Sequence, residues 1–278
     1  MGVCFMTTEQ IMNLALKMAR LDEVPRDSQI YVHGENIKKV LLTVDADAGI
    51  LWTAKNMGYD AVIAHHPAGM NAAVELYKVI EEQMKTLGEH GVPINEAQSA
   101  IMKRQEEMML RAHTSNWKHL VDFARLINMP FMNVHYPCDF MMEKLVEEHL
   151  ERSISDKRNL KVSELIDILC KMPEYKNAVT KPLIVVGNPS NFVGKLCVAF
   201  AGGTNGGANV IKAYWRNGVG TVLVLHMNLS DIYELRKENL QGNLIVAGHI
   251  ASDSVGLNEF ARILEKNGLK VTKLGIVE

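Results

Sequence analysis

The chain has 278 residues, of which 47% are hydrophobic and 22% charged, as expected for a globular protein with a large buried core. The net charge of −2, without a basic block, argues against a nucleic-acid-binding or membrane-binding surface. The four cysteines form no C-x-x-C pair, no apolar run approaches the ~20 residues that span a bilayer, and the N-terminus shows no secretion signal, so we expect a cytoplasmic protein.

The first 65 residues predict a strand–helix–strand unit. Thr7 and Gln10 form a capping box before a helix near 8–20, where apolar residues recur at helical spacing. Strands are expected at 38–47 and 60–65, on either side of the short helix "AGILWTAKNMG". The short connections favour parallel pairing of the two strands.

The middle of the chain is predicted to be mainly helical. Residues 71–127 and 139–178 carry helical periodicity, and a short strand at 131–136 lies between them. These helical segments are expected to be additions to an α/β core that could line a subunit contact.

The C-terminal third returns to alternating strands and helices. Strands are expected at 181–187, 195–203, 219–226, 243–249 and 270–277, and helices at 208–218, 229–239 and 254–268. Two segments, "GYDAVIAHHP" and "GVGTVLVLHM", each run from glycine through an apolar strand to histidine. This repetition predicts two related α/β halves with histidines at the carboxyl ends of strands, where open α/β sheets bind ligands.

Metal-ligand residue types recur at predicted strand ends and turns. His249 and Asp253 are four residues apart, so in the first turn of a helix they would share one face and could share a metal ion. Asp45, at the end of a strand, is expected to orient a ligand histidine or to act as a catalytic base, although a turn-forming role is equally common. The other candidates are His65, His66, His113 and His226.

The segments "VDAD", "GYDAVIAHHPAG", "RAHTSN", "AFAGGTNGG" and "VAGHIASD", in this order, resemble the Nif-three-like family. Its members are labelled GTP cyclohydrolase I type 2 and described as dinuclear-metal proteins. The family pattern is an aspartate strand, a strand ending in His-His-Pro, then His-Thr-Asn-x-Asp, a glycine-rich turn and Gly-His-x-x-x-Glu. The resemblance implies five metal ligands in this chain: His65, His66, His113, His249 and Asp253.

The resemblance also implies an architecture. It is an α/β fold of two related halves with the metal site in the cleft between them and with extra helical segments. The first domain would comprise residues 1–128 plus 250–278, and the second would comprise residues 129–249.

The sequence departs from the family pattern in the third motif. Trp117 stands where the family has an aspartate, and Asp253 shortens the usual glutamate. Either one metal survives on His65, His113, His249 and Asp253, or a nearby residue fills the gap, and a weakened second site is favoured. The residues considered for that gap are Asp45, His119 and His135, although His135 and His226 are more readily explained as structural or outer-sphere residues.

The resulting functional hypothesis is a metal-dependent hydrolase. Imidazoles with a carboxylate suit zinc, iron or manganese, as one or two ions, and such an ion provides a bound hydroxide that attacks a small, nucleotide-like substrate. The alternatives are a non-catalytic metal-binding scaffold and a small-ligand sensor in which "GGTNGG" cradles a phosphate, although a tight turn explains that segment better. The family resemblance implies a homo-oligomer, a toroidal hexamer.

Overall fold

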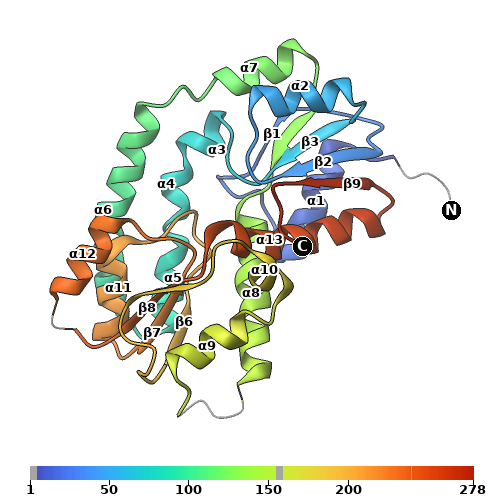
Figure 1. Cartoon of the computed structure of the whole chain (residues 1–278). Coiled ribbons are helices and arrows are strands. Elements are labelled where there is room, and N and C mark those ends of the chain that lie inside the picture. The colour runs from blue at the N-terminus through green and yellow to red at the C-terminus, as the bar shows by residue number, and fades with distance from the viewer. Residues whose placement is uncertain (1–4, 155–158, 239) are drawn as a thin grey trace. The chain divides into compact units, whose positions relative to one another are not determined.

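The computed structural model describes residues 5–154, 159–238 and 240–278, and it divides into two compact units (Figure 1). The first unit contains Met1–Val79, Met108–Met141 and Gly256–Ile276, and the second contains Ile80–Glu107, Met142–Val255 and Val277–Glu278. The boundaries between the units fall inside three helices that contribute residues to both units. Those helices are α6 (Ile94–His113), α8 (Tyr136–Ser153) and α13 (His249–Lys266).

The first unit is built on a five-stranded sheet of order β1-β4-β3-β2-β9. Strands β2, β3, β4 and β9 are parallel, and β1 is antiparallel to β4. The strands are β1 (Gln29–Val32), β2 (Lys39–Thr43), β3 (Ala61–Ala64), β4 (Phe131–Asn133) and β9 (Lys270–Leu274). The further helices of this unit are α1 (Thr8–Ala19), α2 (Ala48–Asn56), α3 (Met70–Val74), α4 (Leu76–Val79) and α7 (His119–Leu126).

Helices cover both faces of this sheet. Val40 and Ile63 pack with residues of α1 and of the C-terminal part of α13 on one face. Leu41 and Val62 pack with residues of α2 and α7 on the other face, and Figure 1 shows α1 and α2 on opposite sides of the strands. Because both faces are covered, β3 is buried at every position and reads as a continuous apolar run.

The second unit has a four-stranded sheet of order β5-β8-β7-β6, in which β5 is antiparallel and the other strands are parallel. The strands are β5 (Leu183–Val186), β6 (Leu196–Val198), β7 (Thr221–Val224) and β8 (Asn243–Val246). The further helices are α5 (Glu82–Glu89), α9 (Val162–Leu169), α10 (Pro173–Asn177), α11 (Gly207–Arg216) and α12 (Leu229–Lys237). Residues of α8 and α9 form a core with Val198, Leu223 and Ile245 of the sheet.

The two sheets repeat one arrangement, which accords with two related halves. The parallel series β2-β3-β4 corresponds to β6-β7-β8, and an antiparallel strand pairs with the last member of each series. Histidines follow equivalent strands: His65 follows β3 and His226 follows β7, whereas His135 follows β4 and His249 follows β8. The repeat places candidate ligands at the carboxyl ends of strands in both units.

Several local predictions hold, and others need correction. The capping box of Thr7 and Gln10 is present, and "MKRQEEMMLRA" is helical within α6. The strand expected at 131–136 is shorter, because α8 already begins at Tyr136, and β1 was not predicted. Cys138, Cys170 and Cys197 are free thiols, and Cys4 lies outside the described residues. Within the described ranges, no helix combines the length and the apolar content needed to cross a membrane.

Candidate metal centre

The two adjacent histidines lie where the chain leaves strand β3. His65 donates its backbone N–H to Thr43 O (2.9 Å) and Val44 O (3.1 Å), and His66 donates its N–H to the same Val44 carbonyl (3.1 Å). In an extended strand, successive N–H groups point to opposite sides, so this shared acceptor shows that the backbone has turned. The turn allows neighbouring imidazoles to lie together, with ring centroids 5.0 Å apart.

A third imidazole comes from the next parallel strand. His135 follows β4, which pairs with β3, and its ring centroid lies 4.8 Å from that of His65 and 5.7 Å from that of His66. One potential ligand atom from each of the three histidines lies within 4.8 Å of the others. The first unit therefore contains a three-histidine cluster, defined as His65, His66 and His135.

A buried carboxylate joins this cluster from the first turn of α8. Asp139 is 2% exposed; its Oδ1 lies 3.2 Å from Nε2 of His65, and its Oδ2 lies 3.7 Å from Nε2 of His135. His135 and Asp139 are four residues apart at the start of the helix, so both side chains lie on one face of it. The arrangement supplies three imidazoles and a carboxylate.

Each imidazole is held through Nδ1 by an oxygen atom. Nδ1 of His65 lies 3.1 Å from Val134 O, Nδ1 of His66 lies 2.7 Å from Asp45 Oδ1, and Nδ1 of His135 lies 2.8 Å from Asp27 Oδ2. A carbonyl or carboxylate oxygen accepts, so Nδ1 is the donor, and a metal ion would bind at Nε2. Histidine ligands in metalloproteins are oriented in this way.

A buried amide links the segments that carry these residues. Asn133 is fully buried, and its Oδ1 accepts from the Gln29 N–H (3.0 Å) and from the Tyr31 hydroxyl (2.7 Å). Its Nδ2 donates to Asp27 O (2.7 Å) and His65 O (3.2 Å), so the four hydrogen-bonding positions of this amide are all used. Burial raises the pKa of Tyr31, which keeps its hydroxyl protonated as the donor. The network fixes the end of β3 against the loop before β1.

The contact between His65 and Asp139 calls for a cation. The Val134 carbonyl can only accept, so Nδ1 of His65 carries a proton and Nε2 of the neutral ring presents a lone pair. Nε2 of His65 lies 3.2 Å from Oδ1 of Asp139, which is also an acceptor. Two buried acceptors at this distance are compatible only with a positive charge between them, supplied by a proton or by a metal ion.

The second unit contains the equivalent histidine–aspartate pair. His249 and Asp253 lie in the first turn of α13, with Nε2 of His249 3.3 Å from Oδ2 of Asp253. Asp253 is 2% exposed, whereas the His249 side chain is 39% exposed. Beside Asp253, Ser252 donates to Gly248 O (2.7 Å) and contacts the Tyr175 hydroxyl (2.8 Å), which anchors the start of the helix.

His226 has the opposite proton arrangement. Its ring centroid lies 4.7 Å from that of His249, and its Nδ1 lies 3.0 Å from the amide nitrogen of Asn205. Because an amide N–H donates, Nδ1 of His226 accepts and the neutral ring carries its proton on Nε2. His226 therefore presents a proton, whereas the histidines of the first unit present lone pairs.

The structure does not bring His113 to the three-histidine cluster. His113 is exposed in the last turn of α6 and belongs to no group of three or more potential ligands among the described residues. His119 is also exposed, and Trp117 is 43% exposed. The backbone carbonyl of Trp117 accepts the Met70 N–H (2.9 Å). The same carbonyl oxygen approaches Gly69 so closely that a Cβ on that residue would lie 2.4 Å from it.

Sequence reasoning missed Asp139, although a signal for it was present. The segment "HYPCD" places His135 and Asp139 four residues apart, which is the spacing of His-Thr-Asn-x-Asp. Because "HTSN" matches the start of that motif literally, the sequence alone places the motif at His113, the last residue of α6. Asp139 is therefore a candidate for the carboxylate that Trp117 does not provide.

The glycine-rich turn is occupied by the chain's own polar groups. The Gly207 N–H donates to Asn205 Oδ1 (3.1 Å), and the Ala208 N–H donates to Asp231 Oδ1 (3.3 Å). Arg104 in turn contacts Asp231 at 2.5 Å. Since Gly207 has a φ of +76°, the local need for glycine is conformational, which favours the tight-turn interpretation.

Comparisons with known proteins agree with this fold. The family described as Duf34/NIF3 (NGG1p interacting factor 3) matches residues 28–277. A NIF3 superfamily protein from Sphaerobacter thermophilus has 36% sequence identity and a TM-score of 0.93, and the match covers 97% of this chain and 98% of that one. Reduced HcgD from Methanocaldococcus jannaschii shares the fold at 15% identity and a TM-score of 0.61, covering 98% and 99% of the two chains. No curated protein sequence matches the chain.

Proposed function

We propose that this chain, which belongs to the Duf34/NIF3 family, uses a bound divalent transition metal to hydrolyse a small substrate. The observation that carries the proposal is the pair of facing acceptors, Nε2 of His65 and Oδ1 of Asp139. The proposed ligands in the first unit are His65, His66, His135 and Asp139.

The residues present fit such an ion. Three imidazole nitrogens with one carboxylate suit zinc, iron or manganese, whereas magnesium and calcium prefer oxygen ligands throughout. The oxygens of Val134, Asp45 and Asp27 hold each ring through Nδ1, so a metal ion would bind at Nε2. We further propose that His249 and Asp253, the equivalent pair in the second unit, act as metal ligands, so the metal count distinguishes one ion from two.

When bound, an ion in this donor set supplies Lewis acidity and lowers the pKa of coordinated water towards neutrality. The chain's own residues then have separate roles. Asp45 orients His66 and, with its side chain 76% exposed, remains accessible to accept a proton. In the second unit, Asn205 donates to Nδ1 of His226, so the neutral ring of His226 is a proton donor at Nε2.

Metal content of purified variants tests the ligand assignment without requiring a known substrate. Wild-type protein is expected to retain stoichiometric transition metal after gel filtration, and His135→Ala and Asp139→Asn are each expected to lose at least half of it. His113→Ala is the matched control and is expected to keep the wild-type metal content. Loss of metal in His113→Ala, with retention in His135→Ala, would reverse the assignment.

Activity assays separate the hydrolase from the scaffold alternative. Metal-loaded protein is expected to turn over at least one member of a panel of nucleotides, cyclic amides and phosphoesters, and Asp139→Asn is expected to abolish that turnover. Stoichiometric metal with no turnover across the panel would favour a metal-binding scaffold. Light scattering of the same samples gives the molar mass, which tests the homo-oligomer, a hexamer, that the family resemblance implies.

A further inference from the structure

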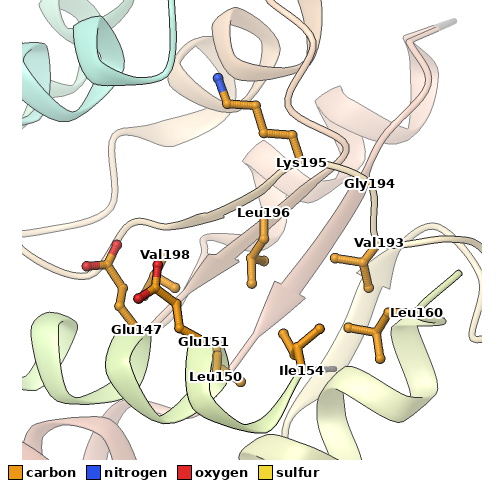
Figure 2. Close-up of a pocket in the computed structure, with 10 residues that line it drawn as sticks. All are labelled: Glu147, Leu150, Glu151, Ile154, Leu160, Val193, Gly194, Lys195, Leu196 and Val198. Carbon is orange, nitrogen blue, oxygen red and sulfur yellow. The ribbon is translucent and has the colours of Figure 1, made fainter. Parts of the chain in front are cut away.

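A cavity of about 330 Å³ lies in the second unit between helix α8 and strand β6, and it shares no residue with the metal centre (Figure 2). Its apolar wall comes from α8, from β6 and from the segments that precede β6. The apolar residues lining it are Leu150, Ile154, Leu160, Val193, Leu196 and Val198. The volume is at the lower end of the range that holds small organic ligands, roughly 300–1,000 Å³.

Two carboxylates stand at one side of this cavity. Glu147 and Glu151 are one helical turn apart on α8, on the face that also carries Leu150 and Ile154 (Figure 2). Lys195, which also lines the cavity, extends away from them and donates to His90 O at 2.6 Å. The cavity therefore combines an apolar wall with an acidic side.

The acidic side has no counter-charge from the described part of the chain. Across residues 5–154, 159–238 and 240–278, neither Glu147 nor Glu151 forms an ion pair with a lysine, arginine or histidine. Burial raises the pKa of Glu147, and the neighbouring carboxylates of Glu151 and Glu89 raise it further. A bound cation would relieve this repulsion, whereas an anion would increase it.

We propose that this cavity binds a small amphipathic amine, with its aliphatic chain between α8 and β6 and its ammonium group at Glu147 and Glu151. An ammonium group offers three N–H donors, which two carboxylates can accept. The apolar side chains contribute affinity through burial of methylene groups, at about fourfold per methylene. This proposed amine binding is additional to the metal chemistry and does not depend on it.

The test uses linear primary amines and the full chain after removal of metal by a chelator. Binding of butan-1-amine, pentan-1-amine and hexan-1-amine is measured by calorimetry or saturation-transfer NMR. We expect affinity to rise about threefold to fourfold with each methylene. Hexan-1-ol, which keeps the chain and lacks the charge, is expected to bind at least tenfold more weakly.

Variants locate the site. Glu147→Gln combined with Glu151→Gln is expected to weaken hexan-1-amine binding by about tenfold or more. Glu148→Gln is the matched control, because Glu148 lies on the same helix, faces Arg152 at 4.0 Å and does not line the cavity. Leu196→Phe, which fills the cavity without changing charge, is expected to weaken binding in the same way.

Three results would overturn the proposal. One is the absence of saturable binding of hexan-1-amine at concentrations up to about 50 mM, roughly the weakest affinity that a six-carbon chain allows. Another is equal affinity for hexan-1-ol and hexan-1-amine. The third is equal loss of affinity in Glu148→Gln and in the double variant, which would indicate non-specific attraction to an acidic surface.

Discussion

Replacing Asp27 by asparagine tests how the chain supports its proposed metal ligands. Asp27 is 0% exposed, and its Oδ2 accepts from Nδ1 of His135 at 2.8 Å. The asparagine side chain would have nearly the same shape but no charge, so His135 would lose the buried carboxylate that raises its basicity. Loss of such a partner typically weakens metal binding by about tenfold to one hundredfold, or about 1.4–2.8 kcal/mol.

Asp45 gives an internal comparison for the same effect. Its Oδ1 contacts Nδ1 of His66 at 2.7 Å, but its side chain is 76% exposed. Water screens an exposed charge, so Asp45→Asn is expected to weaken metal binding by less than about tenfold. The order of effects, Asp27 above Asp45, follows from burial alone.

Competition between the protein and a chromophoric chelator measures these affinities. Asp122→Asn serves as the control, because Asp122 pairs with Lys118 and Arg125 and belongs to no group of potential metal ligands among the described residues. Circular dichroism of each variant checks that it is folded. If folded Asp27→Asn bound metal within twofold of wild type, the claim that Asp27 sustains a ligand histidine would be refuted.

Three further predictions concern stability. Phe131→Ala removes a ring that is 0% exposed and whose centroid lies 5.0 Å from that of Tyr31. It should lower the free energy of unfolding, measured with denaturant, by about 3–5 kcal/mol, and a loss below about 1.5 kcal/mol would contradict the packing described. Thr7→Ala removes the capping hydroxyl of α1 and should cost about 1 kcal/mol, and an unchanged midpoint would contradict the capping box. Hydrogen bonds from Thr7, from its own backbone N–H and from His33 lower the pKa of Glu9 from 4.5 to about 2. The folded state should therefore lose stability as pH falls from 4.5 towards 2, and Glu9→Gln should reduce that loss in melting curves, whereas identical pH profiles would refute it.

The α/β framework could be predicted because its signals are local. The run "DAVIAH" is apolar at consecutive positions because β3 is buried on both faces, and the glycine-bounded helices follow the strands as expected. Strand β1 escaped prediction because it is only four residues long, Gln29–Val32, and lies at the edge of the sheet, where Tyr31 alone is buried.

The proposed ligand set could not be predicted from the sequence because it depends on how the strands pair. His65 and His66 stand out through their adjacency and the proline that follows, but His135 gains meaning only when β4 pairs with β3. The inserted segment of α3 to α7 separates these two strands by many residues, so the sequence offers no direct measure of their proximity. The i, i+4 spacing of His135 and Asp139 is the local sequence signal for this pair, and it matches the family motif in spacing, whereas "HTSN" at His113 matches it in residue type.

Anomalous diffraction from crystals grown with a divalent transition metal tests the central claim most directly. The account predicts a peak coordinated by Nε2 of His65, His66 and His135 and by a carboxylate oxygen of Asp139. A peak at His113, or no peak beside the three-histidine cluster at saturating metal, would contradict it.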